Sequence, residues 1–387
     1  MSRGLILVII FLFLSSFNSY SQDPCPIRIS ILTLSPGDQV ETVFGHSAIR
    51  IKNDSTNDDL VYNYGTFDFN QPNFLSKFIN GKLPYYLSNE DFLPFVEFYK
   101  AGKRTISEQI LNLTCKEKHN IVQFLYNNLQ GTNKFYRYDF ISDNCTTRLR
   151  EIIEKNAESK VYFKRVVPGK SYYRKLLHAD LDYHDHQWMK LGIDLLLGSR
   201  TDKIMTDKEV MFLPDYLMAT IGSSTIGNKP LVLSKINLSG EESPQTGTNF
   251  FIHPLFILSL FSILVVYLSW INKQRVNEIL IRFDGLVFFL FGAIGMVLIY
   301  LWAFSDQLNY RENYNLLWAW PTHLLFSFFS FKRYQWVRNY FKIVTVVYPI
   351  LVIVWFFLPQ HLNPSLIPLV LLVGYRSWIR GFRPTFI

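Results

Sequence analysis

The chain has 387 residues with a formal net charge of +8, and 49% of its residues are hydrophobic. A mean hydropathy of +0.10 is too high for an ordinary soluble chain, and the apolar excess lies after Asn249, which predicts a soluble domain followed by a membrane domain. Part of the positive charge lies in short loops of the apolar half. The polar half has no basic motif with interleaved aromatic residues, so nothing in the composition indicates a nucleic-acid partner.

The N-terminus has the pattern of a signal peptide. A lone Arg3 precedes the apolar run 5–14, and Ser19-Tyr20-Ser21 is a small-x-small cleavage pattern. We assign residues 1–21 to the signal peptide, although an uncleaved anchor would leave the same topology, and expect residues 22–221 to form an exported domain.

The first chemically informative stretch begins at His46. Residues 27–34 alternate as a strand, and His46 starts a second strand that a polar hairpin joins to a third strand at 60–67. His46 then faces the third strand, so that Asn63 or Asp68 can orient its imidazole. A purely structural histidine is the commoner case beside a glycine, and this alternative stays open.

Two further features precede the cysteine segment. Residues 69–87 are rich in aromatic side chains, which we interpret either as core or as the wall of an apolar groove. Thr114 and Glu117 then form a capping box, which predicts a helix that ends at Gly131.

The segment from Ser142 to Arg150 is predicted to turn from an extended conformation into a helix, with Asp143 or Asn144 as its N-cap and Cys145 in its first turn. Unpaired N–H groups and the helix dipole favour a thiolate there. Cys145 is therefore the candidate nucleophile. The alternative is an inert buried cysteine that starts an ordinary helix.

The chain has only three cysteines, and the other two are Cys25 and Cys115. An exported domain permits a disulfide between them, which would leave Cys145 as the free thiol.

The remainder of the polar half contains a predicted strand at 161–167, a predicted helix at 187–197 and a predicted linker at 222–248. His178, His184 and His186 are irregularly spaced and form no HExxH-like pattern. We therefore predict no metal site.

The apolar half, 249–387, is predicted to contain five transmembrane spans. They run over 250–271, 285–304, 316–331, 341–358 and 366–378. Lys and Arg concentrate in alternate loops and in the C-terminal tail, whereas Arg311 is the only Arg or Lys in the two opposite loops. The positive-inside rule therefore places those opposite loops, and the polar domain, outside the inner membrane. Asn315 and His323 lie near the outward end of the third span, where buried polar groups are costly unless they have a function.

No GxSxG, Walker, GxGxxG or zinc-finger motif occurs in the chain. What remains is a histidine strand followed by a cysteine helix about a hundred residues later. Papain-like proteins normally have the cysteine helix first, so this order indicates a circularly permuted papain-like fold.

Several segments resemble the Lnb N-terminal periplasmic domain: Phe44-Gly45-His46, Tyr62-Asn63-Tyr64-Gly65-Thr66-Phe67, Tyr138-Asp139-Phe140, Asp143-Asn144-Cys145-Thr146-Thr147, Gly192-Ile193-Asp194, Leu197-Gly198 and Phe212-Leu213-Pro214. In the apolar half, Asn315-Leu316-Leu317-Trp318 and Pro321 resemble the membrane part of the same proteins. One departure is Ser35, which stands before Pro36-Gly37 where many relatives carry a cysteine.

The resemblance implies an α+β fold: a circularly permuted papain-like (NlpC-like) periplasmic domain followed by an all-α bundle of about five transmembrane helices in the bacterial inner membrane. It implies a lipoprotein N-acyltransferase similar to lecithin:retinol acyltransferase. The acyl group of a phospholipid donor would pass through a thioester on Cys145 to the amine of a diacylglyceryl lipoprotein acceptor, with His46 as the base and no cofactor.

Other residues are assigned supporting roles. Asn63 would orient His46, and Asn144 would position the nucleophile or stabilise the oxyanion. We expect substrate contacts from Tyr64, Asp143, Asn315 and His323. The sequence is also compatible with two rival functions: a membrane-tethered cysteine peptidase or amidase of cell-wall peptides, and a non-catalytic module that binds lipid or peptide.

Overall fold

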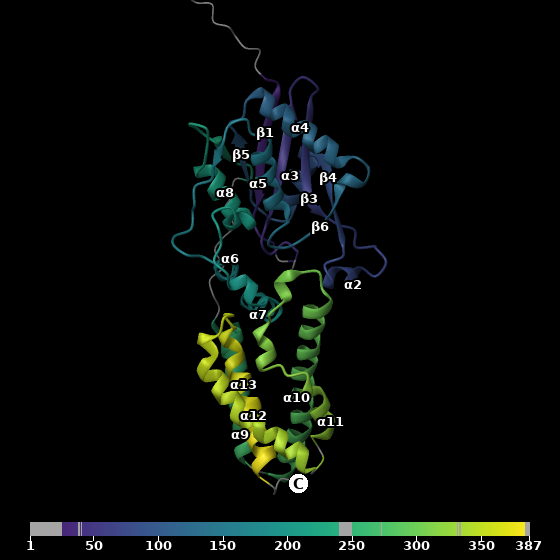
Figure 1. Cartoon of the computed structure of the whole chain (residues 1–387), viewed down its shortest axis with the longest axis vertical. Coiled ribbons are helices and arrows are strands. Elements are labelled where there is room, and N and C mark those ends of the chain that lie inside the picture. Colours follow the sequence, from purple (N-terminus) through teal and green to yellow (C-terminus); the bar gives the residue numbers. More distant parts are fainter. Residues whose placement is uncertain are drawn as a thin grey trace, which may run out of the picture.

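The computed structural model describes residues 25–383 apart from residues 38, 40, 240–249, 272, 331 and 333. The predicted signal peptide lies outside these residues. Within them the chain forms a sheet-containing domain, shown at the top of Figure 1, and a long helical region below it. The coarse prediction of an α+β domain followed by a helical one is therefore confirmed, whereas the papain-like permutation stays a prediction.

The first domain is built on a seven-stranded sheet in which all neighbours are antiparallel. Its strands in spatial order are β10 (Val232–Asn237), β5 (Ile106–Leu111), β1 (Ile27–Leu34), β2 (His46–Asn53), β3 (Asp58–Thr66), β4 (Pro84–Asp91) and β6 (Phe135–Arg137). A smaller sheet contains β7 (Val161–Tyr162), β8 (Thr225–Ile226) and β9 (Lys229–Pro230). The predicted strand at 161–167 is thus much shorter than expected.

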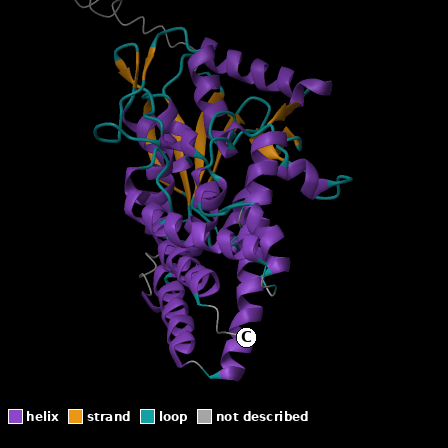
Figure 2. Ribbon diagram, turned by 60° about the horizontal axis from the view of Figure 1, so that its bottom comes forward, coloured by secondary structure: helices purple, strands orange, loops and turns teal. Residues whose placement is uncertain are grey.

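Helices surround the sheet, as Figure 2 shows. They are α2 (Phe74–Ile79), α3 (Phe92–Ala101), α4 (Cys115–Leu129), η1 (Gly131–Lys134), α5 (Cys145–Asn156), α6 (Tyr173–Tyr183), α7 (Gln187–Leu196), η2 (Ser199–Asp202), η3 (Glu209–Phe212) and α8 (Pro214–Ser223). The apolar side chains of α4 and α5, including Ile121, Leu125, Leu149 and Ile153, pack with those of β1 to β3 in the main core. The predicted capping box of Thr114 and Glu117 begins α4 and is confirmed.

The prediction that residues 222–248 form a linker is wrong for its first part. Strand β10 pairs with β5 and extends the sheet at its edge, and β8 and β9 form a hairpin before it. The segment is rich in Ser, Gly and Asn, so its composition resembles a loop. Strand pairing with β5 supplies partners for its backbone groups, which composition cannot reveal. The rest of the predicted linker, from residue 240, lies outside the described residues.

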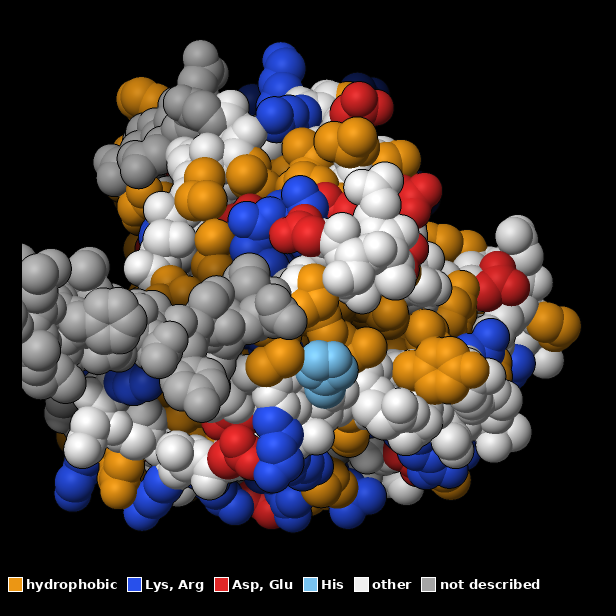
Figure 3. All heavy atoms as spheres, turned by 90° about the horizontal axis from the view of Figure 1, so that it is seen from above, with side chains coloured by type: hydrophobic (Ala, Val, Ile, Leu, Met, Phe, Trp, Pro, Cys, Tyr) orange, Lys and Arg blue, Asp and Glu red, His pale blue; other side chains and the backbone are white. Residues whose placement is uncertain are grey.

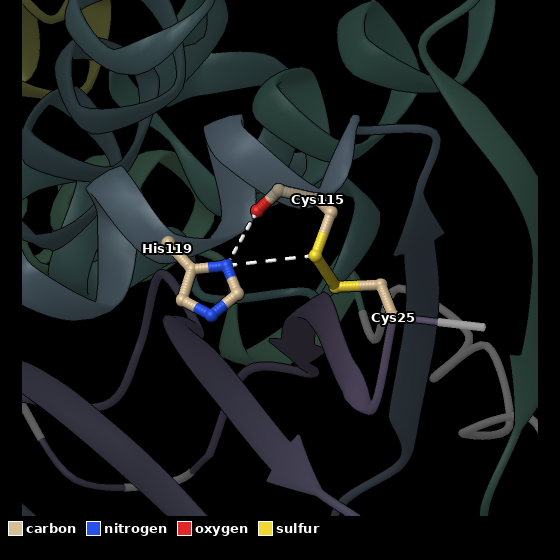
Figure 4. A group of neighbouring side chains, drawn as sticks. All are labelled: Cys25, Cys115 and His119. Carbon is tan, nitrogen blue, oxygen red and sulfur yellow. Dashed lines mark hydrogen bonds between the residues drawn. A yellow bond between two sulfur atoms is a disulfide. The ribbon is translucent and has the colours of Figure 1, made fainter. Parts of the chain in front are cut away.

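A disulfide joins Cys25, just before β1, to Cys115 at the start of α4, which confirms the predicted pairing. Nδ1 of His119, one turn further along α4, lies 3.5 Å from Sγ of Cys115 (Figure 4). Cys145 is the free cysteine. The disulfide ties the N-terminal strand to the helix that covers it.

The helical region contains η4 (Phe250–Ile252), α9 (Pro254–Ile271), α10 (Gln274–Phe304), η5 (Leu308–Tyr310), η6 (Tyr314–Leu317), α11 (Thr322–Phe329), α12 (Gln335–Val354), η7 (Trp355–Phe357), η8 (Pro364–Leu366) and α13 (Ile367–Phe382). Among the described residues, three helical stretches are long and apolar enough to cross a membrane: 254–271, 274–304 and 335–357. Five such spans were predicted. The third predicted span corresponds to α11, which has 8 residues, and the fifth to α13, which has 16. Both helices are too short to be among these three stretches, because 3₁₀ turns precede α11 and α13 begins only after η8.

The two parts meet through the loop between α10 and η6. The backbone N–H of Asp306 donates to Asn80 O, just after α2, and Nε2 of Gln307 donates to Tyr138 O at 2.8 Å. Arg137, at the end of β6, forms an ion pair with Asp306. The lower edge of the sheet in Figure 1 therefore faces the helical region. Figure 3 views the opposite end of the molecule, where acidic and basic side chains are mixed with apolar ones.

Candidate active site

His46 lies at the edge of the sheet that faces the helical region. It pairs with Leu34, the last residue of β1. The preceding Gly45 has φ of +76°, and a Cβ there would lie 2.5 Å from Leu34 O. Because this backbone conformation and this close approach both require glycine, Gly45 sets the position at which the histidine strand begins.

The imidazole of His46 is oriented by a chain of two polar side chains. Its Nε2 lies 3.1 Å from Oδ1 of Asn63 on β3, and Nδ2 of Asn63 donates to the Glu90 carboxylate on β4 at 3.0 Å. Since the carboxylate only accepts, the amide must present its oxygen to the ring, so Nε2 carries the proton. Nδ1 is left as the basic nitrogen and has no hydrogen-bond partner among the described residues.

Of the two orienting residues predicted, Asn63 therefore makes the contact with His46. The Asp68 carboxylate instead accepts from the Asn70 backbone N–H within a turn. Glu90 was not among the predicted residues. The sequence contains no signal for it, because its contact with Asn63 depends on the register of β3 and β4.

Helix α5 begins at Cys145 because Asn144 caps it. Oδ1 of Asn144 accepts from the backbone N–H groups of Thr146 and Thr147, both at 3.0 Å. Nδ2 donates to Phe140 O and Phe212 O, both at 2.8 Å. Both amide protons are thus used. Of the two roles predicted for Asn144, these contacts support positioning and leave no proton of its side chain for an oxyanion.

The sulfur of Cys145 lies beside the histidine strand. The backbone N–H groups of Ser47, Thr146 and Cys145 itself lie close enough to the sulfur to lower the pKa of the thiol. Ser47 directly follows His46 in β2, so two segments about a hundred residues apart in the sequence meet at this sulfur. The N–H groups of Thr146 and Thr147 already donate to the cap, whereas the N–H of Cys145 has no oxygen acceptor among the described residues.

The protonation states differ from the expected thiolate. Burial raises the pKa of the Cys145 thiol above its ordinary value, and the three backbone amides oppose this effect only in part. Burial also lowers the pKa of His46 to about 4, although its hydrogen bond to Asn63 acts in the opposite direction and the nearby Arg104 adds to the lowering. At neutral pH these shifts favour a protonated Cys145 thiol and a neutral His46 imidazole.

Tyr136 on β6 adds a hydroxyl to this site that the sequence analysis missed. Its Oη is buried and has no hydrogen-bond partner among the described residues. The guanidinium carbon of Arg148 lies 3.6 Å from the centre of its ring. Burial raises the pKa of Tyr136, and negative charge on Cys145 raises it further. The hydroxyl therefore stays protonated and is a free donor near the sulfur. The only signal in the sequence was its position shortly before the cysteine segment.

Two predicted substrate contacts lie in this region but bind other protein groups. The carboxylate of Asp143 forms a two-point ion pair with Arg148, at 2.6 and 2.8 Å. Tyr64 is buried and its ring meets that of Tyr136 edge to face. Both residues support the ring of Tyr136, Tyr64 directly and Asp143 through Arg148, and the Asp143 carboxylate is engaged by that ion pair.

Asn315 and His323, the other two predicted substrate contacts, lie inside the helical region and not at its surface. Asn315 is fully buried, donates to Asp194 O and accepts from Trp318 Nε1. His323 is also fully buried, with its ring nitrogens bonded to the hydroxyls of Tyr340 and Tyr348. Their polar groups are satisfied inside the helical region, so they have a structural role here.

The described residues contain one group with the spacing of metal ligands, formed by Cys25, Cys115 and His119. Its two sulfurs are joined in the disulfide, so they do not offer thiolate ligands. Of the three histidines considered earlier, His178 contacts the Asp194 carboxylate at 2.8 Å.

Comparison with models of protein families finds two matches. Residues 16–179 match the model of the Lnb N-terminal periplasmic domain, and residues 245–383 match the model of the Lnb transmembrane domain. The first match contains His46, Asn63 and Cys145. Neither the curated proteins nor the solved structures contain a match to the chain. The two family models follow one another in the same order as the sheet-containing domain and the helical region.

Proposed function

Because the chain belongs to the Lnb family, whose domains indicate a membrane enzyme that modifies lipoproteins, we propose that it is a lipoprotein N-acyltransferase of the inner membrane. It would transfer a fatty acyl group from a phospholipid to the N-terminal amine of a diacylglyceryl-cysteine lipoprotein. The observation that carries this proposal is the position of the Cys145 sulfur close to the backbone N–H of Ser47, the residue that follows His46, while Nδ1 of His46 has no hydrogen-bond partner among the described residues.

The first half of the reaction would form a thioester. Nδ1 of His46 takes the proton from the Cys145 thiol as the sulfur attacks the ester carbonyl of the phospholipid. The tetrahedral intermediate expels the lysophospholipid oxygen, which receives the proton from His46. Asn63 and Glu90 hold the ring so that Nδ1 faces the reaction and the proton on Nε2 stays in place.

In the second half the lipoprotein amine attacks the thioester carbonyl and gives up a proton to His46. Collapse of this intermediate forms the amide and releases the Cys145 sulfur, which regains its proton. Two steps through one covalent intermediate mean that the lipid ester and the amine need not meet directly. The same site with water as acceptor would be a hydrolase, so the nature of the acceptor separates this proposal from the peptidase alternative.

The intermediates would be stabilised by the N–H of Cys145 and by the Tyr136 hydroxyl. Replacing Tyr136 by Phe is expected to lower the rate of acyl transfer by roughly 10²-fold, since removal of one oxyanion donor has that scale of effect. The rate constant should fall, with little change in the lipid concentration that half-saturates the enzyme. The variant keeps the ring that packs on Arg148, so its thermal unfolding should match that of the parent. An unchanged rate would exclude this hydroxyl as an oxyanion donor.

The aromatic segment that begins at residue 69 offers a route from the membrane to the cysteine. Exposed apolar side chains, including Leu75 and Phe78, occupy α2, which is attached to the end of the membrane-spanning candidate α10. Rings contact one another in an unbroken series from α2 to the neighbourhood of Cys145: Phe78, Phe74, Phe67, Tyr85 and Tyr138. We infer that α2 dips into the outer leaflet and that an acyl chain follows these rings.

Changing Leu75 and Phe78 together to Asp is expected to lower activity on phospholipid in vesicles by roughly tenfold or more, because each loses its burial in lipid. Activity on a water-soluble short-chain ester should change little. The matched control is Tyr126→Asp on α4, which also introduces a charge at an exposed aromatic residue. Equal effects of the α2 and α4 variants, or an equal loss on the soluble ester, would contradict the membrane role of α2.

The function itself is tested in a host that lacks its own lipoprotein N-acylation. Intact mass spectrometry of a lipoprotein N-terminus should show one added acyl chain when the chain is expressed, and a free amine would reject the acyltransferase. Purified protein incubated with phospholipid should also gain a hydroxylamine-sensitive acyl mass on the Cys145 peptide. Cleavage of cell-wall peptides without N-acylation would favour the peptidase instead.

A further inference from the structure

A cavity of about 450 Å³ lies where α10 ends and the following loop begins. It is lined by Ile299, Trp302 and Ala303 of α10 and by Arg311. The three helix residues are spaced by three and four positions, so they lie on one face of the helix. Ile299 and Trp302 are 42% and 41% exposed. This apolar face is at the end of a membrane-spanning candidate, with a cationic side chain above it.

Arg311 has no ion pair or side-chain hydrogen bond among the described residues, and its Nε is buried without an acceptor. The neighbouring charges are already matched: Arg200 pairs with Glu312, and Arg137 pairs with Asp306. A partly buried guanidinium without a partner is costly, because the group requires several acceptors. The cavity therefore contains unsatisfied positive charge next to an apolar wall.

The position of Arg311 is set by its backbone. Gly198 N–H donates to Asn309 O, and Ser199 N–H donates to Glu312 O. A Cβ at Gly198 would lie 1.8 Å from Arg311 O, so only glycine allows this contact. The backbone of the loop is therefore held in place without a ligand, so binding an anion through Arg311 would require ordering of the side chain but not of the loop.

The same loop contacts the segment that leads to Cys145. Nδ2 of Asn309 donates to the Asp139 carboxylate at 3.2 Å, and Gln307 bonds to Tyr138 O. Asp139 in turn exchanges two backbone hydrogen bonds with Asp143, two residues before Cys145. A ligand held by Arg311 would thus be bound by the loop on which the catalytic segment rests.

We propose that Arg311, Ile299 and Trp302 form a binding site for the phosphodiester and glycerol part of a phospholipid in the outer leaflet. A guanidinium matches phosphate oxygens in charge and geometry. The wall formed by α10 accepts the first methylene groups of the chains, and the end of a span is at the level of lipid head groups. This inference rests on the proposed function in one respect: the lipid bound here would be the acyl donor.

The test measures binding to the full chain carrying Cys145→Ser, by native mass spectrometry, with dihexanoyl phosphatidylglycerol as the probe. Arg311→Gln is expected to weaken binding roughly tenfold to a hundredfold, and Arg311→Lys less. The matched control is Lys82→Gln, which removes an exposed cation that lines no described cavity and should change binding less than about twofold. Dihexanoylglycerol, which lacks the phosphate, should bind the parent and Arg311→Gln equally.

Parent-like binding by Arg311→Gln, or an equal effect of Lys82→Gln, would overturn the site. Inorganic phosphate that displaces the lipid probe at equal concentration would also overturn it, because the site would then be one for a free anion. The experiment distinguishes failure of the Arg311 site from failure of the proposed acyltransferase function. Acylation of Cys145 in the parent together with unchanged binding in Arg311→Gln refutes only the site. Lost binding in that variant without any acyl-Cys145 in the parent refutes only the function.

Discussion

Replacing Cys145 by Ala is expected to reduce N-acylation by roughly 10⁴-fold or more, to a level near the background rate. The chain has no other free thiol, because the remaining two cysteines are joined in a disulfide. Loss of the nucleophile also makes the base that activates it ineffective. The measurement is the initial rate of acyl transfer to a synthetic diacylglyceryl-cysteine peptide in phospholipid vesicles, together with the acyl mass on the 145 peptide.

Cys145→Ser is the matched variant for this prediction. It keeps the size of the side chain and the amides around it, so its thermal unfolding should resemble that of the parent. Any acyl group it collects would be an oxygen ester with much lower sensitivity to hydroxylamine. Acyl transfer by Cys145→Ala at a rate close to that of the parent would mean direct transfer or a different nucleophile, and would remove the thioester mechanism.

Replacing His46 by Ala is expected to lower the rate by roughly 10²- to 10⁴-fold, the usual contribution of a positioned general base. Added imidazole should restore part of the activity if the ring acts as a base. The control is His119→Ala, a histidine of the same domain that lies beside the disulfide and not at the site. Equal losses in both variants, or no rescue by imidazole, would indicate a structural role for His46.

The pH dependence gives this prediction a second readout. The pKa of His46 is lowered from 6.5 to about 4, so Nδ1 stays unprotonated, and activity should persist well below pH 6.5 and fall as the pH approaches about 4. The lowered pKa of His46 also makes the free energy of unfolding depend on pH. The neutral ring is favoured in the folded state, so this stabilisation is complete above pH 6.5 and is lost as the pH falls from 6.5 through about 4. A limb of the activity profile centred at pH 6.5 would contradict the lowered pKa of His46.

Local patterns in the sequence were sufficient for much of the polar domain. Helix α4 follows from the capping box of Thr114 and Glu117, and α5 from a capping residue before an apolar face. Such signals act within one turn of the chain, so they need no knowledge of the fold. The contact of Asn63 with His46 could be anticipated because both belong to one hairpin.

Other features depend on contacts between distant segments. Strand β10 has the composition of a linker, and its pairing with β5 cannot be read from its own residues. The thiol of Cys145 was expected to ionise from its helix position, but burial raises its pKa. Desolvation depends on everything that surrounds a side chain and is stronger here than the local effect of the helix end.

What the sequence determined by itself is the set of reactive groups and their order: a histidine strand, a capped cysteine helix and an apolar half that follows them. Only the tertiary structure decided which atoms face one another. It brought Tyr136 and Glu90 to the site and placed Arg311 beside an apolar cavity with no ion-pair partner in the described part of the chain. The physical reason is range: caps and periodicity act between neighbours in the chain, whereas strand register, burial and the packing of the domain on α10 are set by the whole fold.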